Sequence, residues 1–173
     1  MKRSYLPMLA VAVVFCAAGA WFGARQLEPS AAAPNALSQF YGRTMPDSTG
    51  KQVDMKQWKG KPLVLNFWAT WCAPCVEEMP ELTALQSELQ SKNIQILGIG
   101  IDNPASISAF AEKYKIAYPL YVAGMEGSEL SRQLGNQAGG LPFTVLIDAS
   151  GKVRKTYLGR LKMDALRRDI AAM

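Results

Sequence analysis

The chain has 173 residues, of which 49% are hydrophobic and 19% charged, with 19 basic and 14 acidic side chains and a net charge of +5. Three basic residues and no acids fall in the first 27 residues, so the remainder carries 16 basic and 14 acidic residues, a net charge of +2 that gives a nucleic-acid role no support. The chain has no His, which excludes a c-type haem attachment site and argues against a zinc site.

Residues 1–27 have the composition of a membrane segment. Lys2 and Arg3 precede 21 uncharged residues, Ser4–Ala24, and a helix of that length would reach across the roughly 30 Å of a bilayer's hydrocarbon core. The leading basic residues favour an N-terminus inside the cell and a domain outside it. A cleaved signal peptide is the alternative, because Ala18–Ala20 fits a cleavage site. Either way we expect an extracytoplasmic domain, anchored in the bacterial cytoplasmic membrane or soluble in the periplasm.

The residues after this segment predict a linker and then one domain. Residues 28–38 are read as a polar linker, and residues 39–173 have the length and apolar content of a single domain. Within residues 39–55 the turn residues Ser48-Thr49-Gly50 predict a β-hairpin, and residues 54–60 a helical turn that leads into the next strand.

The stretch 61–80 contains the main motif. Leu63–Trp68 is an apolar run that predicts a buried strand, and a Cys-x-x-Cys pair follows it at Cys72 and Cys75. Apolar residues then recur at three- and four-residue spacing, which predicts an amphipathic helix that begins at the cysteines and presents Val76, Met79, Leu82, Leu85 and Leu89 on one face. Pro74 falls in the first turn, where its missing N–H is not needed, and is a candidate substrate-binding residue.

A strand-to-helix junction suits thiol chemistry. Unpaired amide groups and the positive end of the helix dipole would lie against Cys72 and favour its thiolate, so we expect Cys72 to be the nucleophile. Cys75 would lie one turn further in, more covered and close enough for a disulfide, as suits a resolving thiol. The third cysteine, Cys16, falls in the apolar leader and is read as an apolar filler. A structural disulfide with no catalytic role remains an alternative.

The second half of the chain predicts alternating strands and helices. The β-branched run 94–101 predicts a buried strand in which Gly98 and Gly100 permit close backbone approach. A helix from Pro104, a strand at 118–122 and a short helix at 128–134 follow, which implies a parallel crossover. Pro142 opens a further apolar strand, and the turn 149–152 leads to a strand at 153–158 and a final helix at 162–171.

At these residues the chain resembles a known group. Phe67–Cys75 is similar to the active-site stretch of the thioredoxin superfamily, and the pattern from Gln39 onward resembles the TlpA/ResA/CcmG group of membrane-anchored thiol-disulfide oxidoreductases. The resemblance implies an α/β thioredoxin fold with an N-terminal β-hairpin and a central inserted strand/helix unit. It also implies that Pro142 is a cis-proline facing the cysteine pair, which would free the Leu141 backbone to pair with an extended substrate. A trans proline that ends a loop is the alternative.

One departure from cytosolic thioredoxin concerns the proton. The acidic residue that thioredoxin carries in the strand before its motif is replaced by Asn66, which cannot take a proton. In the ResA-like group a Glu three residues after the second Cys is assigned that role, and Glu78 matches its position. A partly enclosed carboxylate there could accept the Cys75 proton. Alternatively Glu78 is an ordinary exposed acid, as we expect for Glu77 and Glu81.

The resulting hypothesis is a reductant of protein disulfides with no cofactor or metal, in which Trp71 is an apolar platform beside the site or, alternatively, a core residue. Ala73-Pro74 between the cysteines offers no positive charge to stabilise a thiolate, which favours the reducing direction. An oxidant or isomerase of the same fold and a Cu(I)-binding thiol carrier remain alternatives. The resemblance implies apocytochromes c as substrates and a membrane thiol transporter as electron donor.

Overall fold

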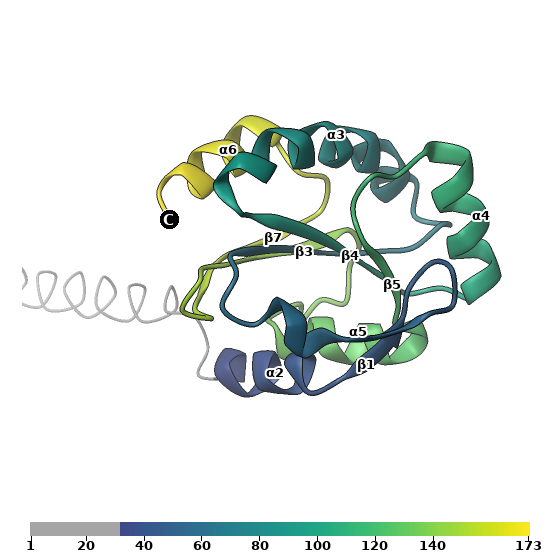
Figure 1. The fold of residues 1–173 in the computed structure, drawn as a ribbon, viewed down its shortest axis with the longest axis horizontal. Coiled ribbons are helices and arrows are strands. Elements are labelled where there is room, and N and C mark those ends of the chain that lie inside the picture. Colours follow the sequence, from purple (N-terminus) through teal and green to yellow (C-terminus); the bar gives the residue numbers. More distant parts are fainter. Residues whose placement is uncertain (1–31) are drawn as a thin grey trace, which may run out of the picture. The chain divides into compact units, whose positions relative to one another are not determined.

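The computed structural model describes residues 32–173, and the predicted membrane segment 1–27 lies outside this range (Figure 1). Across the described part of the chain, none of the helices is both long and apolar enough to span a bilayer. The helices are α2 (Ala32–Tyr41), α3 (Ala73–Leu89), α4 (Pro104–Tyr114), α5 (Gly124–Gln133) and α6 (Met163–Ala171), with two 3-10 turns, η1 (Met55–Trp58) and η2 (Gln90–Lys92). The strands are β1 (Thr44–Pro46), β2 (Gln52–Asp54), β3 (Leu63–Trp68), β4 (Gln95–Gly100), β5 (Leu120–Val122), β6 (Phe143–Ile147) and β7 (Val153–Leu158).

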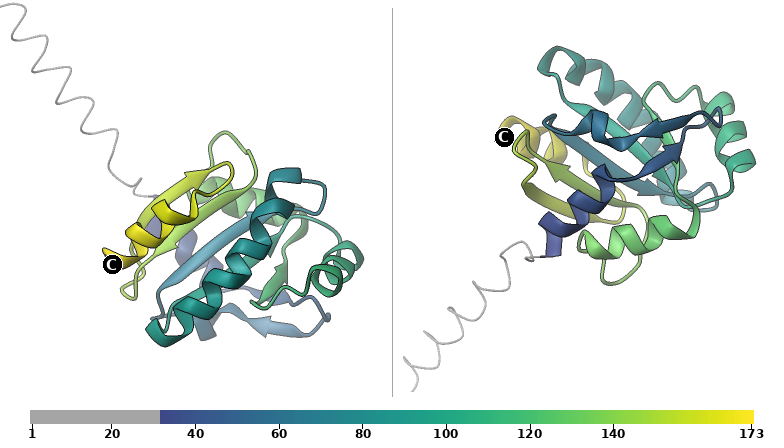
Figure 2. Two further views of the ribbon diagram at one scale, coloured as in Figure 1. Left: turned by 90° about the horizontal axis from the view of Figure 1, so that it is seen from above. Right: turned by 60° about the horizontal axis from the view of Figure 1, so that its bottom comes forward.

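The sheet has five strands in the order β5-β4-β3-β6-β7. Strands β3, β4 and β5 run parallel, and β6 and β7 are antiparallel to their neighbours. Figure 2 shows α3 and α6 side by side across one face of the sheet, and α2 and α5 on the opposite face. The thioredoxin fold is therefore confirmed: α4 and β5 form the inserted helix and strand, and β1 and β2 pair as the N-terminal hairpin.

Strand β3 lies at the centre of this arrangement and all six of its residues are buried. Because side chains alternate along a strand, Val64, Asn66 and Trp68 face α3, while Leu63, Leu65 and Phe67 face α2 and α5. Burying each large apolar side chain here contributes about 1.5–3 kcal/mol, so both faces fix the strand's register. The carboxyl end of β3 is thereby held rigidly where the cysteines follow.

Glycines in β4 allow the neighbouring strands and helices to pack closely, as predicted. A Cβ atom at Gly98 would lie 2.4 Å from Leu120 Cδ2 and 3.1 Å from Trp68 Nε1. At Gly100 it would lie 2.3 Å from Ile107 Cδ1. A larger residue at either position would force the Leu120 or Ile107 side chain to move, so both glycines serve close packing rather than an unusual backbone conformation.

The predicted linker is wrong for residues 32–38. These residues belong to helix α2, in which Ala36, Leu37 and Phe40 are buried in the cluster beneath the sheet. The spacing of these three residues gives one apolar stripe along the helix. Three consecutive Ala followed by Pro34 lacked the charge pattern of an amphipathic helix, and α2 gains its stability from packing on the domain rather than from propensity.

Candidate active site

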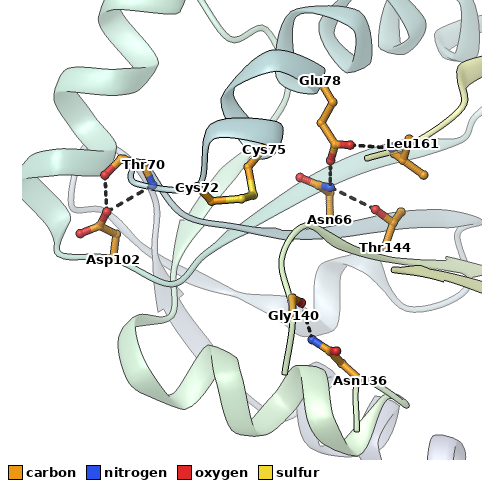
Figure 3. The surroundings of a disulfide bond; sticks show 10 residues. All are labelled: Asn66, Thr70, Cys72, Cys75, Glu78, Asp102, Asn136, Gly140, Thr144 and Leu161. Carbon is orange, nitrogen blue, oxygen red and sulfur yellow. Dashed lines mark hydrogen bonds between the residues drawn. A yellow bond between two sulfur atoms is a disulfide. The ribbon is translucent and has the colours of Figure 1, made fainter. Parts of the chain in front are cut away.

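Cys72 and Cys75 are joined in a disulfide at the amino end of α3 (Figure 3). Cys72 is the N-cap residue, with extended backbone angles, and its carbonyl accepts hydrogen bonds from the amides of Cys75 and Val76. The two Cα atoms are 5.2 Å apart, within the normal range for a disulfide. Cys72 is 6% exposed and Cys75 is fully buried, so an incoming thiolate or disulfide meets Cys72 first.

The helix end favours a thiolate on Cys72. No side chain caps α3, and no acid lies in its first turn. The positive end of the helix dipole therefore acts on the Cys72 sulfur without a competing carboxylate in the same turn. Once the disulfide is reduced, this environment stabilises the charged form of Cys72.

Glu78 lies one turn beyond Cys75 and is fully buried, which is unusual for a carboxylate. Its Oε1 accepts a hydrogen bond from Asn66 Nδ2 at 2.7 Å, and its Oε2 accepts one from the Leu161 amide at 2.9 Å (Figure 3). Burial raises the pKa of Glu78 to about 7, although the hydrogen bonds from Leu161 and Asn66 and the charge of Arg160 oppose the rise. Glu78 can therefore gain or lose a proton at neutral pH.

The neighbouring acids behave differently, as predicted. Glu77 and Glu81 are exposed on the surface of α3 and both pair with Arg160 at 2.8 Å. Of these three nearby carboxylates on α3, one therefore points into the protein and two point into solvent.

Asn66 joins two strands at this point. Besides its bond to Glu78, its Nδ2 donates to Thr144 Oγ1 of β6 at 3.1 Å. Within residues 32–173, Asn66 Oδ1 is buried and has no hydrogen-bond partner. Asn66 therefore supplies a donor to the carboxylate form of Glu78 while keeping one acceptor unused.

The loop before Cys72 is fixed by Asp102, which follows β4. The Asp102 carboxylate accepts hydrogen bonds from the Thr70 hydroxyl and, at 3.3 Å, from the Thr70 amide. Its partial burial raises the pKa of Asp102, but the hydrogen bonds from Thr70 and Asn103 outweigh this and leave it below its usual value. Asp102 stays ionised and ties the active-site loop to the end of β4.

The Leu141–Pro142 peptide bond is cis, as the resemblance implied. The Pro142 carbonyl accepts a hydrogen bond from the Gly159 amide at 2.8 Å, and the Gly140 carbonyl accepts one from Asn136 Nδ2. The Leu141 side chain packs against the cluster that contains both cysteines. Among the described residues the Leu141 backbone has no hydrogen-bond partner, so it is available to an extended chain.

Trp71 separates two surface grooves and is 70% exposed, which rules out a core role. One groove, of about 770 Å³, runs between Trp71, Leu141 and the N-terminal turn of α5, where Met125 is 83% exposed. The other, of about 630 Å³, lies between the start of α3 and α4. Pro74 is exposed in the first turn of α3 and lines neither groove.

The chain is similar to proteins of known activity. The family model described as Redoxin matches residues 29–172. The chain belongs to the Redoxin family. It is 30% identical to the thiol-disulfide oxidoreductase ResA of Geobacillus thermodenitrificans over 76% of this chain and 77% of the relative, and 32% identical to ResA of Bacillus thuringiensis over 69% and 68%. This redoxin is accordingly a thiol-disulfide oxidoreductase that acts on protein disulfides.

Solved structures share the fold of this redoxin. A thiol:disulfide interchange protein of the thioredoxin family from Chlorobium tepidum is 26% identical, with a TM-score of 0.66, over 75% of this chain and 91% of that one. A secreted disulfide oxidoreductase of Mycobacterium tuberculosis is 21% identical with a TM-score of 0.65, covers 78% of this redoxin and 98% of its own chain, and shows the fold alone.

Several residues of the redoxin site were missed from the sequence. Thr144 is a polar residue inside an apolar strand run, which is a usable signal for a buried partner. Asp102, Arg160 and the Leu161 amide gave no such signal, because their partners lie 32 to 83 residues away. The described residues contain no group of three or more potential metal ligands.

Proposed function

We propose that this redoxin reduces protein disulfides outside the cytoplasm, with Cys72 as nucleophile, Cys75 as resolving thiol and Glu78 as proton acceptor. The observation that carries the proposal is a fully buried Glu78, one helical turn from Cys75, whose pKa is about 7. A general base works best when its pKa lies near the working pH.

The proposed reaction is a thiol-disulfide exchange in which the two cysteines supply both electrons. In the reduced protein the Cys72 thiolate attacks one sulfur of a substrate disulfide, forming a mixed disulfide and releasing the other substrate sulfur as a thiolate. Cys75 then passes its proton to Glu78, and its sulfur attacks Cys72 Sγ. The Cys72–Cys75 disulfide forms, the second substrate thiol leaves, and two electrons have passed from protein to substrate.

We further propose that an extended substrate segment lies along the Leu141 backbone, with an apolar side chain in the groove between Trp71 and Met125. The free Leu141 backbone supports strand-like pairing, and the two exposed apolar residues support side-chain recognition. Pro74, exposed in the first turn of α3 outside this groove, is proposed as a further substrate contact beside Cys72, and Pro142 as part of the substrate-binding loop. The resemblance to the ResA and CcmG proteins favours apocytochrome c Cys-x-x-Cys-His segments as the substrate, a membrane thiol donor as the source of electrons, and an anchor in residues 1–27.

The test is the reduction potential of the fragment from Glu28 onward, equilibrated against dithiol buffers. A value near or below about −220 mV is expected of a reductant that draws on an electron supply. A value of about −120 to −180 mV would make the protein an oxidant or isomerase and would remove the reductant role, and with it the cytochrome assignment.

A further inference from the structure

The segment Gly159–Leu161, between β7 and α6, contacts three parts of the active site. Gly159 donates its amide to the carbonyl of Pro142, and Leu161 donates its amide to Oε2 of Glu78. Between them, Arg160 reaches back to α3, with Nη1 2.8 Å from Glu77 Oε2 and Nη2 2.8 Å from Glu81 Oε1. Three successive residues thus connect the cis-proline loop, the buried carboxylate and the surface of the catalytic helix.

We propose that Arg160 is a positioning residue for Glu78: its paired contacts with Glu77 and Glu81 hold the segment Gly159–Leu161 against α3 and keep the Leu161 amide on the buried carboxylate. Glu77 and Glu81 lie one residue before and three residues after Glu78, so the guanidinium spans the helix at the level of that residue. A guanidinium suits this place because its planar fork binds two carboxylates at once.

The ion pairs act through geometry rather than through stability. The side chains of Arg160, Glu77 and Glu81 are 50%, 59% and 45% exposed, and exposed pairs contribute little to the free energy of folding. The Leu161 amide, in contrast, reaches Glu78 in the interior, where a lost hydrogen bond is not replaced by water. A small displacement of the segment Gly159–Leu161 would therefore mainly weaken the hydrogen bond to Glu78.

The expected consequence concerns the proton on Glu78. The Leu161 hydrogen bond opposes the rise in the pKa of Glu78 that burial causes, and the charge of Arg160 acts in the same direction. In the disulfide form, in which Cys75 does not titrate, the other charged or titratable groups around Glu78 are Glu77 and Glu81 on α3 and the buried Tyr118 ahead of β5. Asn66 and Thr144, from β3 and β6, are uncharged.

The first variant is Arg160→Ala, and the readout is the ¹³C carboxyl titration of Glu78 in the disulfide form of the protein. The resonance is assigned by its loss in Glu78→Gln. We expect the midpoint to rise by about one pH unit, which lowers the ionised fraction at pH 7 about fivefold. The Glu78 midpoint of Arg160→Lys should lie between those of Arg160→Ala and the wild type. The matched control is Arg167→Ala, which removes an equally exposed ion pair between α6 and α3, to Glu88, and should leave the midpoint unchanged.

The double variant Glu77→Ala/Glu81→Ala separates positioning from charge. Removing two carboxylates lowers the midpoint if charge alone matters, whereas losing the contacts that hold Arg160 raises it. A midpoint above that of the wild type supports the proposal, and one at or below it overturns the proposal, as does an unchanged midpoint in Arg160→Ala.

The same variants connect this inference to the proposed function, on which its kinetic part rests. If Glu78 is the proton acceptor, reduction of a small disulfide by Arg160→Ala should be about fivefold slower at pH 7 and should recover by pH 9. A raised titration midpoint with unchanged kinetics would keep the positioning role and reject Glu78 as the base, so the two failures are distinguishable.

Discussion

Asn66 stands where cytosolic thioredoxin carries an acidic residue, and in this chain Glu78 supplies the titratable group instead. Asn66 cannot titrate, and the acid comes instead from α3, where it accepts two hydrogen bonds. A protonated Glu78 would become a hydrogen-bond donor. A 180° rotation of the Asn66 side-chain amide would then place its unused Oδ1 to accept the hydrogen bond from the Glu78 carboxyl group. Asn66 can therefore serve both states of Glu78. The sequence identified this acid by resemblance, but not the Leu161 amide, which lies 83 residues away.

The first prediction concerns rate. Glu78→Gln removes the proton acceptor, so we expect reduction of a model disulfide at pH 7 to slow by about 10²-fold, the lower end of the usual range for general-base catalysis. Stopped-flow kinetics of the reduced variant would measure it. Glu88→Gln, an exposed acid on the same helix, is the control. Equal rates for Glu78→Gln and the control would remove Glu78 from the site.

The second prediction concerns stability. The folded protein binds the Glu78 proton more tightly than the unfolded chain, because the pKa rises from 4.5 to about 7. The resulting stabilisation is fully present below pH 4.5 and is lost as pH rises through 7, a change of about 3 kcal/mol in the free energy of unfolding. Urea unfolding of the oxidised protein at pH 5 and 8 would detect it. In Glu78→Gln this part of the pH dependence should disappear; an unaltered pH dependence would contradict the prediction.

At the scale of elements, local patterns located most of the fold. Apolar runs and turn residues placed β3, β4, α4 and the β6–β7 hairpin, because these signals are contained in a few consecutive residues. Helix α2 was not predicted. Its short apolar stripe, Ala36, Leu37 and Phe40, is too weak a local pattern, and the helix is stabilised by packing against the sheet. Helix α3 was predicted across Pro80, because the apolar spacing continues on both sides of that proline.

The third prediction tests α2. Phe40 is fully buried, so Phe40→Ala should lower the free energy of unfolding by about 3 kcal/mol or more through lost burial and the cavity left behind. Chemical denaturation would measure the change, with Ser38→Ala on the exposed side of the same helix as the control. A loss of under about 1 kcal/mol would mean that α2 contributes little to the domain.

At the scale of the molecule, the exposed apolar side chains gather near the chemistry. Among the described residues, Trp71 and Met125 are the two most exposed large apolar side chains, and both line the groove beside Leu141. The cysteine motif and Pro142 anticipated the reactive centre. The groove's far wall could not be foreseen, because the placement of α5 beside the motif depends on the whole topology.

The fourth prediction tests this groove. Met125→Ser should lower kcat/KM for a peptide disulfide with an apolar flanking residue about tenfold, the value of one buried apolar contact, and should leave reduction of a small aromatic disulfide unchanged. Leu158→Ser, which removes an exposed apolar residue of β7 outside this groove, is the control. A parallel loss on both substrates would assign Met125 to structure instead of recognition.

The buried carboxylate also gives the protein an unusual buffering behaviour. A chain with no His lacks the side chain that normally absorbs protons between pH 6 and 7.5, so uptake in that interval by the oxidised form is dominated by Glu78. A group with a pKa of about 7 takes up about two thirds of a proton between pH 7.5 and pH 6, so an acid–base titration of the purified protein should show that much more uptake than Glu78→Gln, the α-amino group being common to both. The titration of the whole protein would then report the protonation of one buried carboxylate without an isotopic label.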